Sequence, residues 1–304
     1  MTAGGSSRST QECGADQCAN YTSTAAPFFR LGEEQRSAVL IVPGFGGWTD
    51  LYTDMGAALR EQGHPEVAVV GVSTHEWLPH AFAGRSFTWY LLRVIAELDR
   101  LFERHKSVSV VAHSQGGVLA LILLGSHLYD GKVYDGAAKV EGLVTLGAGF
   151  KSDENYPFSF LFATQENRSN EEPLPPNLPS GEADRIRKHS LAFTNYYYSN
   201  AAQLPGVRIT CVSGCCQEKP WEGWGLEQVR NMIYSIYASL CYKVSLKHSR
   251  VVGDGVTPTC LATLPGASGQ IVLPGVRHMN SFPFYGLPWY GSRDAVAVWD
   301  KCLR

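Results

Sequence analysis

Short runs of apolar, largely β-branched residues alternate along this chain with longer segments in which apolar residues recur every three or four positions. The short runs have the length of strands and end in glycines or other turn residues, so they predict strands. These strands lie within residues 37–48, 66–73, 108–113, 139–150, 206–214 and 268–276. The longer segments predict helices within 49–64, 86–105, 115–124 and 292–303.

The predicted strands are apolar along their whole length and do not alternate with polar residues. Strands of this kind are typical of a parallel sheet that helices cover on both faces. The sequence therefore predicts an α/β fold built on a doubly wound, mostly parallel sheet. In such folds ligands bind at the carboxyl ends of the strands.

Three segments depart from this rhythm. Residues 1–30 are small and polar and lack the apolar stretch of a secretory signal, so we expect a disordered or loosely attached segment. Residues from about 151 to 205 and from about 215 to 250 are too long for simple connections and predict two insertions. We therefore expect one domain over residues 31–304 that carries a lid or cap insertion.

Composition narrows the classes of protein. The 304 residues are 44% hydrophobic and 18% charged, which suits one large buried core. The formal net charge is -2, and Lys and Arg form no cluster, which argues against a nucleic-acid-binding surface or a polybasic membrane patch. No apolar run reaches the roughly 18 residues that a membrane-spanning helix requires.

The cysteine pattern favours buried thiols with one or two disulfides. The chain has 8 cysteines, which is many for a cytosolic enzyme and few for a disulfide scaffold, so the compartment stays open. Cys211, Cys215 and Cys216 are closely spaced, but no second pair of ligands follows at the spacing of a zinc finger. The sequence therefore predicts no metal site.

The junction between the third predicted strand and the following helix carries the strongest chemical pattern. There Ala112-His113-Ser114-Gln115-Gly116 matches a nucleophile elbow in which Ala replaces the first Gly. Small residues are needed around such a turn because its backbone is strained and crowded. The alternative is a serine that only caps the helix. The position between an apolar strand and an apolar helix favours a catalytic Ser114.

A serine hydroxyl needs a base that takes its proton and an acid that orients the base. In this kind of fold the chain order is Ser, then Asp or Glu, then His, on loops after later strands. Asp254 lies in a Gly-flanked turn, and His278 directly follows the last predicted strand. An Asp-Gly turn and a solvated loop histidine are the alternatives, and Asp153 and Asp184 are the next candidates for the acid.

Acyl transfer also needs donors aimed at the developing oxyanion. The backbone N–H of Gln115, at the start of the helix after the nucleophile, is one candidate. The N–H of Phe45, in the Gly-rich loop after the first strand, is the second. Neither a phosphate-binding loop nor a dinucleotide-binding glycine pattern is present, so no nucleotide cofactor is predicted.

The segment His75-Glu76-Trp77-Leu78-Pro79-His80 has histidines near a glutamate, as zinc proteases do. The spacing is one residue too long, and Pro79 would break the helix that must carry both ligands. A metalloprotease is therefore disfavoured. His113 is expected to be a packing residue beside the nucleophile.

Taken in order, the segments VPGFGG, EWLPHAFAGRSFTWYLLRVI, VVAHSQGGVLA, VTLGAGF, GDGVTP, PGVRH and WYGSRDAVAVW resemble the lipase-like serine hydrolases of the α/β-hydrolase superfamily found in cyanobacteria and plant plastids. The resemblance runs from about residue 37 to the C-terminus. It implies the α/β-hydrolase fold, esterase or lipase activity on apolar esters, chlorophyll or lipid esters among them, and a chloroplast setting. By motif it gives Ser114 as nucleophile, Asp254 as acid and His278 as base.

The sequence thus predicts a carboxylic ester hydrolase that acts on a lipophilic small-molecule ester through an acyl-enzyme. A thioesterase with the same triad and a non-catalytic relative used for binding are the alternatives. Aromatic clusters within 156–162, 193–200, 221–224 and 282–290 either line the acyl pocket or fill the seam under the insertions. We also expect transient contact of the lid with a membrane surface, while the oligomeric state stays open.

Overall fold

The computed structural model describes residues 36–83, 85–150, 174–216, 226–246, 251–280 and 286–303. Its centre is a six-stranded sheet in the order β2-β1-β3-β4-β5-β6, in which every neighbouring pair is parallel. The strands are β1 (Ala38–Val42), β2 (Val67–Val69), β3 (Val108–His113), β4 (Val140–Leu146), β5 (Arg208–Cys215) and β6 (Gly269–Pro274). The strand order reverses between β1 and β3, and such a switch point is where ligands bind in open α/β sheets.

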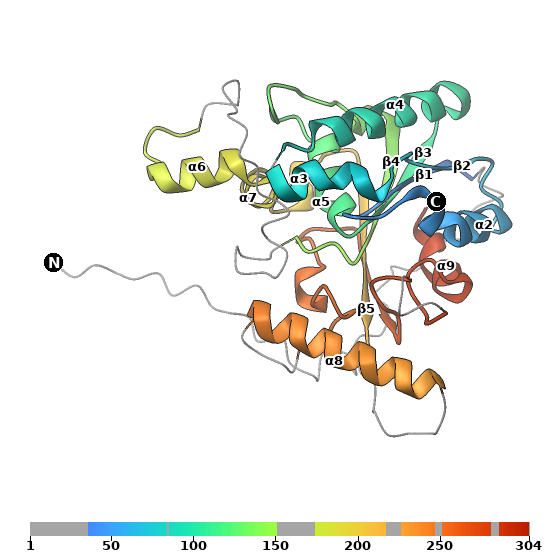
Figure 1. The fold of residues 1–304 in the computed structure, drawn as a ribbon. Coiled ribbons are helices and arrows are strands. Elements are labelled where there is room, and N and C mark those ends of the chain that lie inside the picture. The colour runs from blue at the N-terminus through green and yellow to red at the C-terminus, as the bar shows by residue number, and fades with distance from the viewer. Residues whose placement is uncertain are drawn as a thin grey trace.

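Helices cover both faces of the sheet (Figure 1). The α-helices are α2 (Thr53–Glu61), α3 (Leu78–Ala83), α4 (Thr88–His105), α5 (Gln115–Leu124), α6 (Ser180–Lys188), α7 (Ser190–Tyr197), α8 (Leu226–Leu246) and α9 (Arg293–Trp299). Short 3₁₀ helices occupy Thr49–Tyr52, Thr74–Trp77, Ala137–Lys139, Ala201–Gln203, Thr259–Leu261 and Asp300–Cys302. Helices α4 and α5 pack on one face of the sheet, and α2 and α9 on the other.

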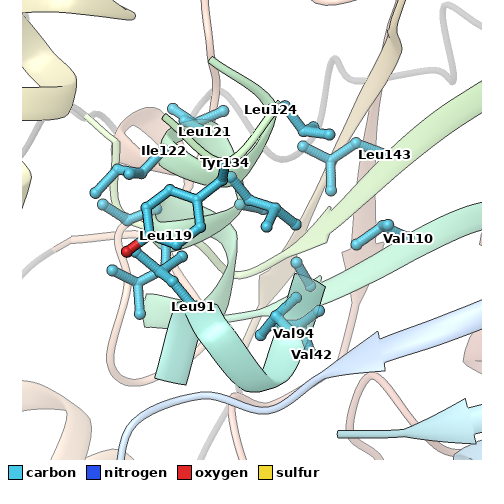
Figure 2. Close-up of a cluster of buried hydrophobic side chains, with 14 of the residues drawn as sticks. Val42, Leu91, Val94, Val110, Leu119, Leu121, Ile122, Leu124, Tyr134 and Leu143 are labelled. Carbon is cyan, nitrogen blue, oxygen red and sulfur yellow. The ribbon is translucent and has the colours of Figure 1, made fainter. Parts of the chain in front are cut away.

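Neighbouring residues of one strand enter different cores. Leu40 of β1 and Val110 of β3 pack with α4 and α5, while Ile41 and Val111 face α2 and α9. Figure 2 shows the first of these cores, where side chains of α4, α5 and the strands meet. The uninterrupted apolar strands are therefore explained by burial on both faces, and the predicted doubly wound α/β sheet is confirmed.

The predicted elements differ from the observed ones mainly at their ends. Strand β2 is only Val67–Val69, and as an edge strand it pairs with β1 alone. Helix α5 has all ten residues buried, as expected of a helix that is apolar on every side. A short helix, α3, was not expected; Pro79 is its second residue, where the missing N–H has no helical partner to lose.

The insertions are described only in part. Helices α6 and α7 lie in the first, and α8 in the second, where the sequence has a helical pattern. Residues 151–173, 217–225 and 247–250 and the N-terminal segment 1–30 lie outside the described residues, so the predicted lid and domain limits stay predictions. None of the helices in the described part of the chain has both the length and the apolar character to cross a bilayer.

Candidate active site

Ser114 lies in the turn between β3 and α5, at the switch point of the sheet. Its φ of 52° is a positive value that a non-glycine residue adopts at a cost. The N–H of Ser114 donates to the Leu146 carbonyl at 2.8 Å, and the Ser114 carbonyl accepts from the Gly117 N–H at 3.0 Å. The Ser114 side chain makes no capping bond to α5, so its hydroxyl does not serve the helix as a cap.

Glycines make room for this turn. A Cβ atom on Gly44 would lie 2.8 Å from the Ser114 Cβ, and one on Gly116 would lie 2.7 Å from the carbonyl oxygens of Val42 and Pro43. Contacts under 3.0 Å essentially never occur for a real Cβ atom. The loop after β1 can therefore lie against Ser114 and the start of α5 only because these two positions are glycine.

His278 follows β6 and joins the other two predicted residues. Its Nε2 lies 2.9 Å from Ser114 Oγ, and its Nδ1 lies 2.7 Å from Asp254 Oδ2. A carboxylate only accepts hydrogen bonds, so the proton of a neutral His278 is on Nδ1, and Nε2 is free to accept from the serine hydroxyl. Both distances are within the range for general-base catalysis. The structure thus places Ser114, His278 and Asp254 in one hydrogen-bonded path.

The carboxylate of Asp254 is fully buried and accepts four hydrogen bonds. Oδ1 accepts from the backbone N–H groups of Val256 (2.9 Å) and Thr257 (2.6 Å), and Oδ2 accepts from His278 and from the Tyr290 hydroxyl (2.7 Å). Burial raises the pKa of Asp254, but the charge of His278 and these hydrogen bonds outweigh burial and hold the pKa below its ordinary value. Asp254 therefore stays ionised and keeps the Nδ1 tautomer of His278.

Two tyrosines of α8 bind the backbone of the acid and base loops. The Tyr234 hydroxyl donates to the Asp254 carbonyl and accepts from the His278 N–H at 3.1 Å. The Tyr242 hydroxyl accepts from the Gly255 N–H at 2.8 Å. The helix of the second insertion therefore helps to hold the site. The sequence offered no signal for this, since tyrosines eight residues apart in a helix look like core residues.

Phe45 and Gln115 are both next to the Ser114 turn. Phe45 follows Gly44, which abuts Ser114, and Gln115 is the first residue of α5. The Phe45 ring packs on Trp77 at 5.2 Å between ring centroids, and the Trp77 indole N–H donates to the Gly47 carbonyl at 3.0 Å. The backbone of both residues predicted to stabilise the oxyanion is thus held beside the Ser114 turn, and that role stays a prediction.

His113 is more than the packing residue that the sequence predicts. It is 4% exposed, and each of its ring nitrogens has a polar partner. Nδ1 lies 2.8 Å from the Tyr52 hydroxyl, and Nε2 lies 2.9 Å from the backbone carbonyl of His278. A purely apolar core position would supply neither partner. Because the neighbouring strand residues are apolar, the sequence gave no sign that the His113 ring would find two polar partners.

Other candidates from the sequence are not brought to the site. His75 lies in the 3₁₀ helix Thr74–Trp77 and His80 in α3, so one helix does not carry both histidines. No group of three residues that could hold a metal ion occurs in the described ranges. Of the closely spaced cysteines, Cys215 is disulfide-bonded, as is Cys260, while Cys211 and Cys216 are not assigned to a disulfide.

The aromatic segments also separate into two groups. Phe193 and Tyr198 pack with the core around α5, and Trp289 and Tyr290 pack with the core around α2 and α9. Phe193 and Tyr198 thus lie between the first insertion and the sheet, as the second interpretation expects, whereas Trp289 and Tyr290 fill a core outside the insertions. The segments 156–162 and 221–224 and residues 282–285 lie outside the described residues.

The chain was compared with known proteins by sequence and by structure. No protein-family model and no curated protein matches the sequence. Among solved structures, a metagenomic carboxyl esterase is 14% identical with a TM-score of 0.52, over 91% of this chain and 79% of that chain. Methylketone synthase I from tomato is 12% identical (TM-score 0.39; 88% and 98% covered), and a thioesterase domain from the curacin biosynthetic pathway is 13% identical (TM-score 0.39; 89% and 92% covered).

The match to the carboxyl esterase, together with the six-stranded parallel sheet, shows that the chain has the α/β-hydrolase fold. In other matches the aligned part spans only about half of the solved chain, 51% for a metagenome-derived lipolytic enzyme and 51% for a pyrethroid hydrolase from Sphingobium faniae. The identity to the carboxyl esterase is only 14%, so that likeness shows the fold alone. The resemblance to the cyanobacterial and plastid group stays a prediction.

Proposed function

We propose that this protein is a serine hydrolase that cleaves a carboxylic ester of a lipophilic substrate through an acyl-Ser114 intermediate. The observation that carries the proposal is the path from Ser114 Oγ through His278 to a buried, ionised Asp254, with distances of 2.9 Å and 2.7 Å. A serine that served only the fold would need neither a positive φ nor an imidazole within reach of its hydroxyl.

In the acylation half-reaction, Ser114 Oγ bonds to the carbonyl carbon of the ester while its proton passes to His278 Nε2. The carbonyl oxygen gains negative charge, which the backbone N–H groups of Phe45 and Gln115 stabilise. Asp254 stabilises the imidazolium that forms. When the tetrahedral intermediate collapses, the bond to the alcohol oxygen breaks and His278 donates its proton to the departing alcohol.

Deacylation repeats these steps with water. His278 Nε2 takes one proton from a water molecule, and the oxygen of that water bonds to the acyl carbon. The second tetrahedral intermediate collapses, Ser114 Oγ leaves and recovers the proton from His278, and the carboxylic acid departs. The protein is thereby returned to its starting state with no redox change and no external reactant except water.

A lipophilic substrate is supported by the surface beside the Phe45 loop. Helix α3 follows Trp77, and its His80 ring lies 6.3 Å from the Phe45 ring. Leu78 and Phe82 of α3 are 47% and 84% exposed, and their spacing puts them on one face of the helix. Large apolar side chains on a surface next to a catalytic loop favour contact with an apolar ligand.

The test is covalent labelling with a fluorophosphonate probe, followed by identification of the labelled peptide. We expect the probe on Ser114, no labelling of Ser114→Ala, and slow labelling of His278→Ala. Ser109→Ala is the matched control, because Ser109 lies in β3, the strand that leads to Ser114, but its hydroxyl pairs with Ser37 at 2.8 Å. A folded protein that stays unlabelled at Ser114 would overturn the proposal and favour a non-catalytic relative.

A series of hydrolysis assays identifies the class of substrate. p-Nitrophenyl esters of rising chain length, a galactolipid ester and a pigment ester cover the lipophilic range, and an acyl thioester covers the sulfur leaving group. We expect kcat/KM to rise with chain length among the oxygen esters. Faster turnover of the thioester than of the oxygen ester with the same acyl chain would make the protein a thioesterase.

A further inference from the structure

His113 connects three loops that the proposed reaction needs. It ends β3, directly before Ser114, and its side chain lies between Tyr52 and the His278 backbone. The Tyr52 hydroxyl also accepts from the Gly44 N–H at 2.9 Å. A path of three hydrogen bonds therefore runs from the loop of Phe45 through Tyr52 and His113 to the loop of the catalytic base.

The hydrogen atoms along this path follow from the partners. A backbone carbonyl only accepts, so His113 Nε2 carries a proton and donates to the His278 carbonyl. In a neutral imidazole Nδ1 is then an acceptor, and the Tyr52 hydroxyl donates to it. The oxygen of Tyr52 keeps lone pairs for the Gly44 N–H. Every group on the path is satisfied in one arrangement, and only in the Nε2–H tautomer of His113.

The surroundings keep His113 neutral. Its burial, and after it the charge of His278, lower the pKa of His113 from 6.5 to about 3. The rings of His113 and His278 are 4.8 Å apart between centroids. A positive charge on His113 would oppose the proton that His278 takes up in the proposed reaction, so neutrality serves the base as well as the hydrogen-bond path.

We propose that His113, in its neutral Nε2–H tautomer and together with Tyr52, is a positioning residue that holds the Gly44–Phe45 loop and His278 in register with Ser114. The inference rests on the proposed function. The three loops follow different strands, β1, β3 and β6, so their relative positions depend on side-chain contacts such as these. A small displacement of either loop would move the oxyanion donors or the base away from the reacting carbon.

The two halves of the path can be removed separately. Tyr52→Phe removes the hydroxyl between Gly44 and His113 while it keeps the buried ring. In His113→Asn, Oδ1 takes the place of Nδ1 and keeps the bond to Tyr52, whereas in His113→Gln, Nε2 keeps the bond to the His278 carbonyl. We expect each variant to lower kcat about tenfold or more and to leave KM within about twofold, since the path does not touch the substrate.

A double variant distinguishes positioning from general damage. Tyr52→Phe already removes the bond to Gly44 and the bond to His113, and His113→Gln removes only the second of these. The double variant therefore loses no bond beyond those lost in Tyr52→Phe, and its kcat should fall no further than that of Tyr52→Phe alone. Tyr198→Phe is the matched control: the Tyr198 hydroxyl accepts from the His127 N–H at 2.9 Å and lies 3.0 Å from His127 Nδ1. It packs beside Gly125 at the far end of α5, and its loss should leave kcat within about twofold.

The tautomer is measured on the unmodified protein by nitrogen-15 NMR of the imidazole rings. We expect His113 to show a protonated Nε2 and a bare Nδ1 throughout pH 5 to 8. A protonated Nδ1, a titration in that range, or unchanged kcat in Tyr52→Phe and both His113 variants would overturn the inference while an active parent protein upholds the proposed function. An inactive parent protein would overturn both.

Discussion

The buried His113 should contribute to the pH dependence of the protein's stability, and His113→Gln should remove that contribution. The group is neutral in the folded state, because burial and the charge of His278 lower its pKa from 6.5 to about 3. In the unfolded chain it regains a pKa near 6.5. Between these two values the unfolded chain binds one more proton than the folded protein. The contribution of neutral His113 to stability is therefore fully present above pH 6.5 and is lost as the pH falls toward 3.

The size of the effect follows from the two pKa values. On going from pH 7 to pH 5 the unfolded state becomes protonated at His113 while the folded state does not. This linkage lowers the free energy of unfolding by about 2 kcal/mol. This free-energy change depends almost entirely on the pKa of His113 in the unfolded chain, because its pKa in the folded protein is far below pH 5. Buried carboxylates add little in this window, since their folded and unfolded pKa values lie below it.

Urea unfolding followed by tryptophan fluorescence at pH 7 and pH 5 measures this quantity. The parent protein should lose about 2 kcal/mol more than His113→Gln over that interval, whatever the two stabilities are at pH 7. Thr145→Val is the control: its Oγ1 is buried with no hydrogen-bond partner among the described residues, and the substitution removes no titratable group. Its pH dependence should match the parent. Equal losses in the parent and His113→Gln would refute the reasoning.

Three further predictions concern the surroundings of the site. Tyr290→Phe removes a hydrogen bond to the buried acid, so stability should fall by about 1–3 kcal/mol in urea unfolding and kcat should fall as well. Gly116→Ala places a methyl group 2.7 Å from two carbonyl oxygens and should cost about 1–3 kcal/mol of unfolding free energy, whereas Gly71→Ala, with nothing within 4 Å, should cost far less; equal costs would contradict the crowding. Phe82→Ser should lower kcat/KM for a long-chain ester about tenfold and leave that for an acetate ester unchanged, whereas Val298→Ser, which alters a residue 44% exposed on α9, should change neither.

The fold could be predicted from sequence because its strands and helices differ in pattern over short distances. The apolar strand at residues 108–113 and the apolar helix after it are local signals, and burial on two faces explains both. Strand ends were less predictable. Strand β2 ends at Val69 although the apolar residues continue with Val70. The length of an edge strand depends on pairing with the neighbouring strand, which the apolar sequence alone does not define.

The residues of the site likewise include some that could be predicted from sequence and some that could not. Ser114, Asp254 and His278 stand out by type, by order and by the turns that hold them, and the structure brings the three together. Tyr52 and Tyr290 could not be found by the same reasoning. Their hydroxyls act on residues 61 and 36 positions away in the chain, and in the sequence they are ordinary aromatic residues of a core.

Trapping the acyl-enzyme tests the central proposal most directly. The protein is mixed with a long-chain p-nitrophenyl ester, quenched in acid within milliseconds, and examined by intact mass and peptide mapping. We expect a mass increase equal to the acyl group, located on Ser114 and absent from Ser114→Ala. Release of p-nitrophenol by the parent protein with no acyl group on Ser114, or with the acyl group on another residue, would contradict the account.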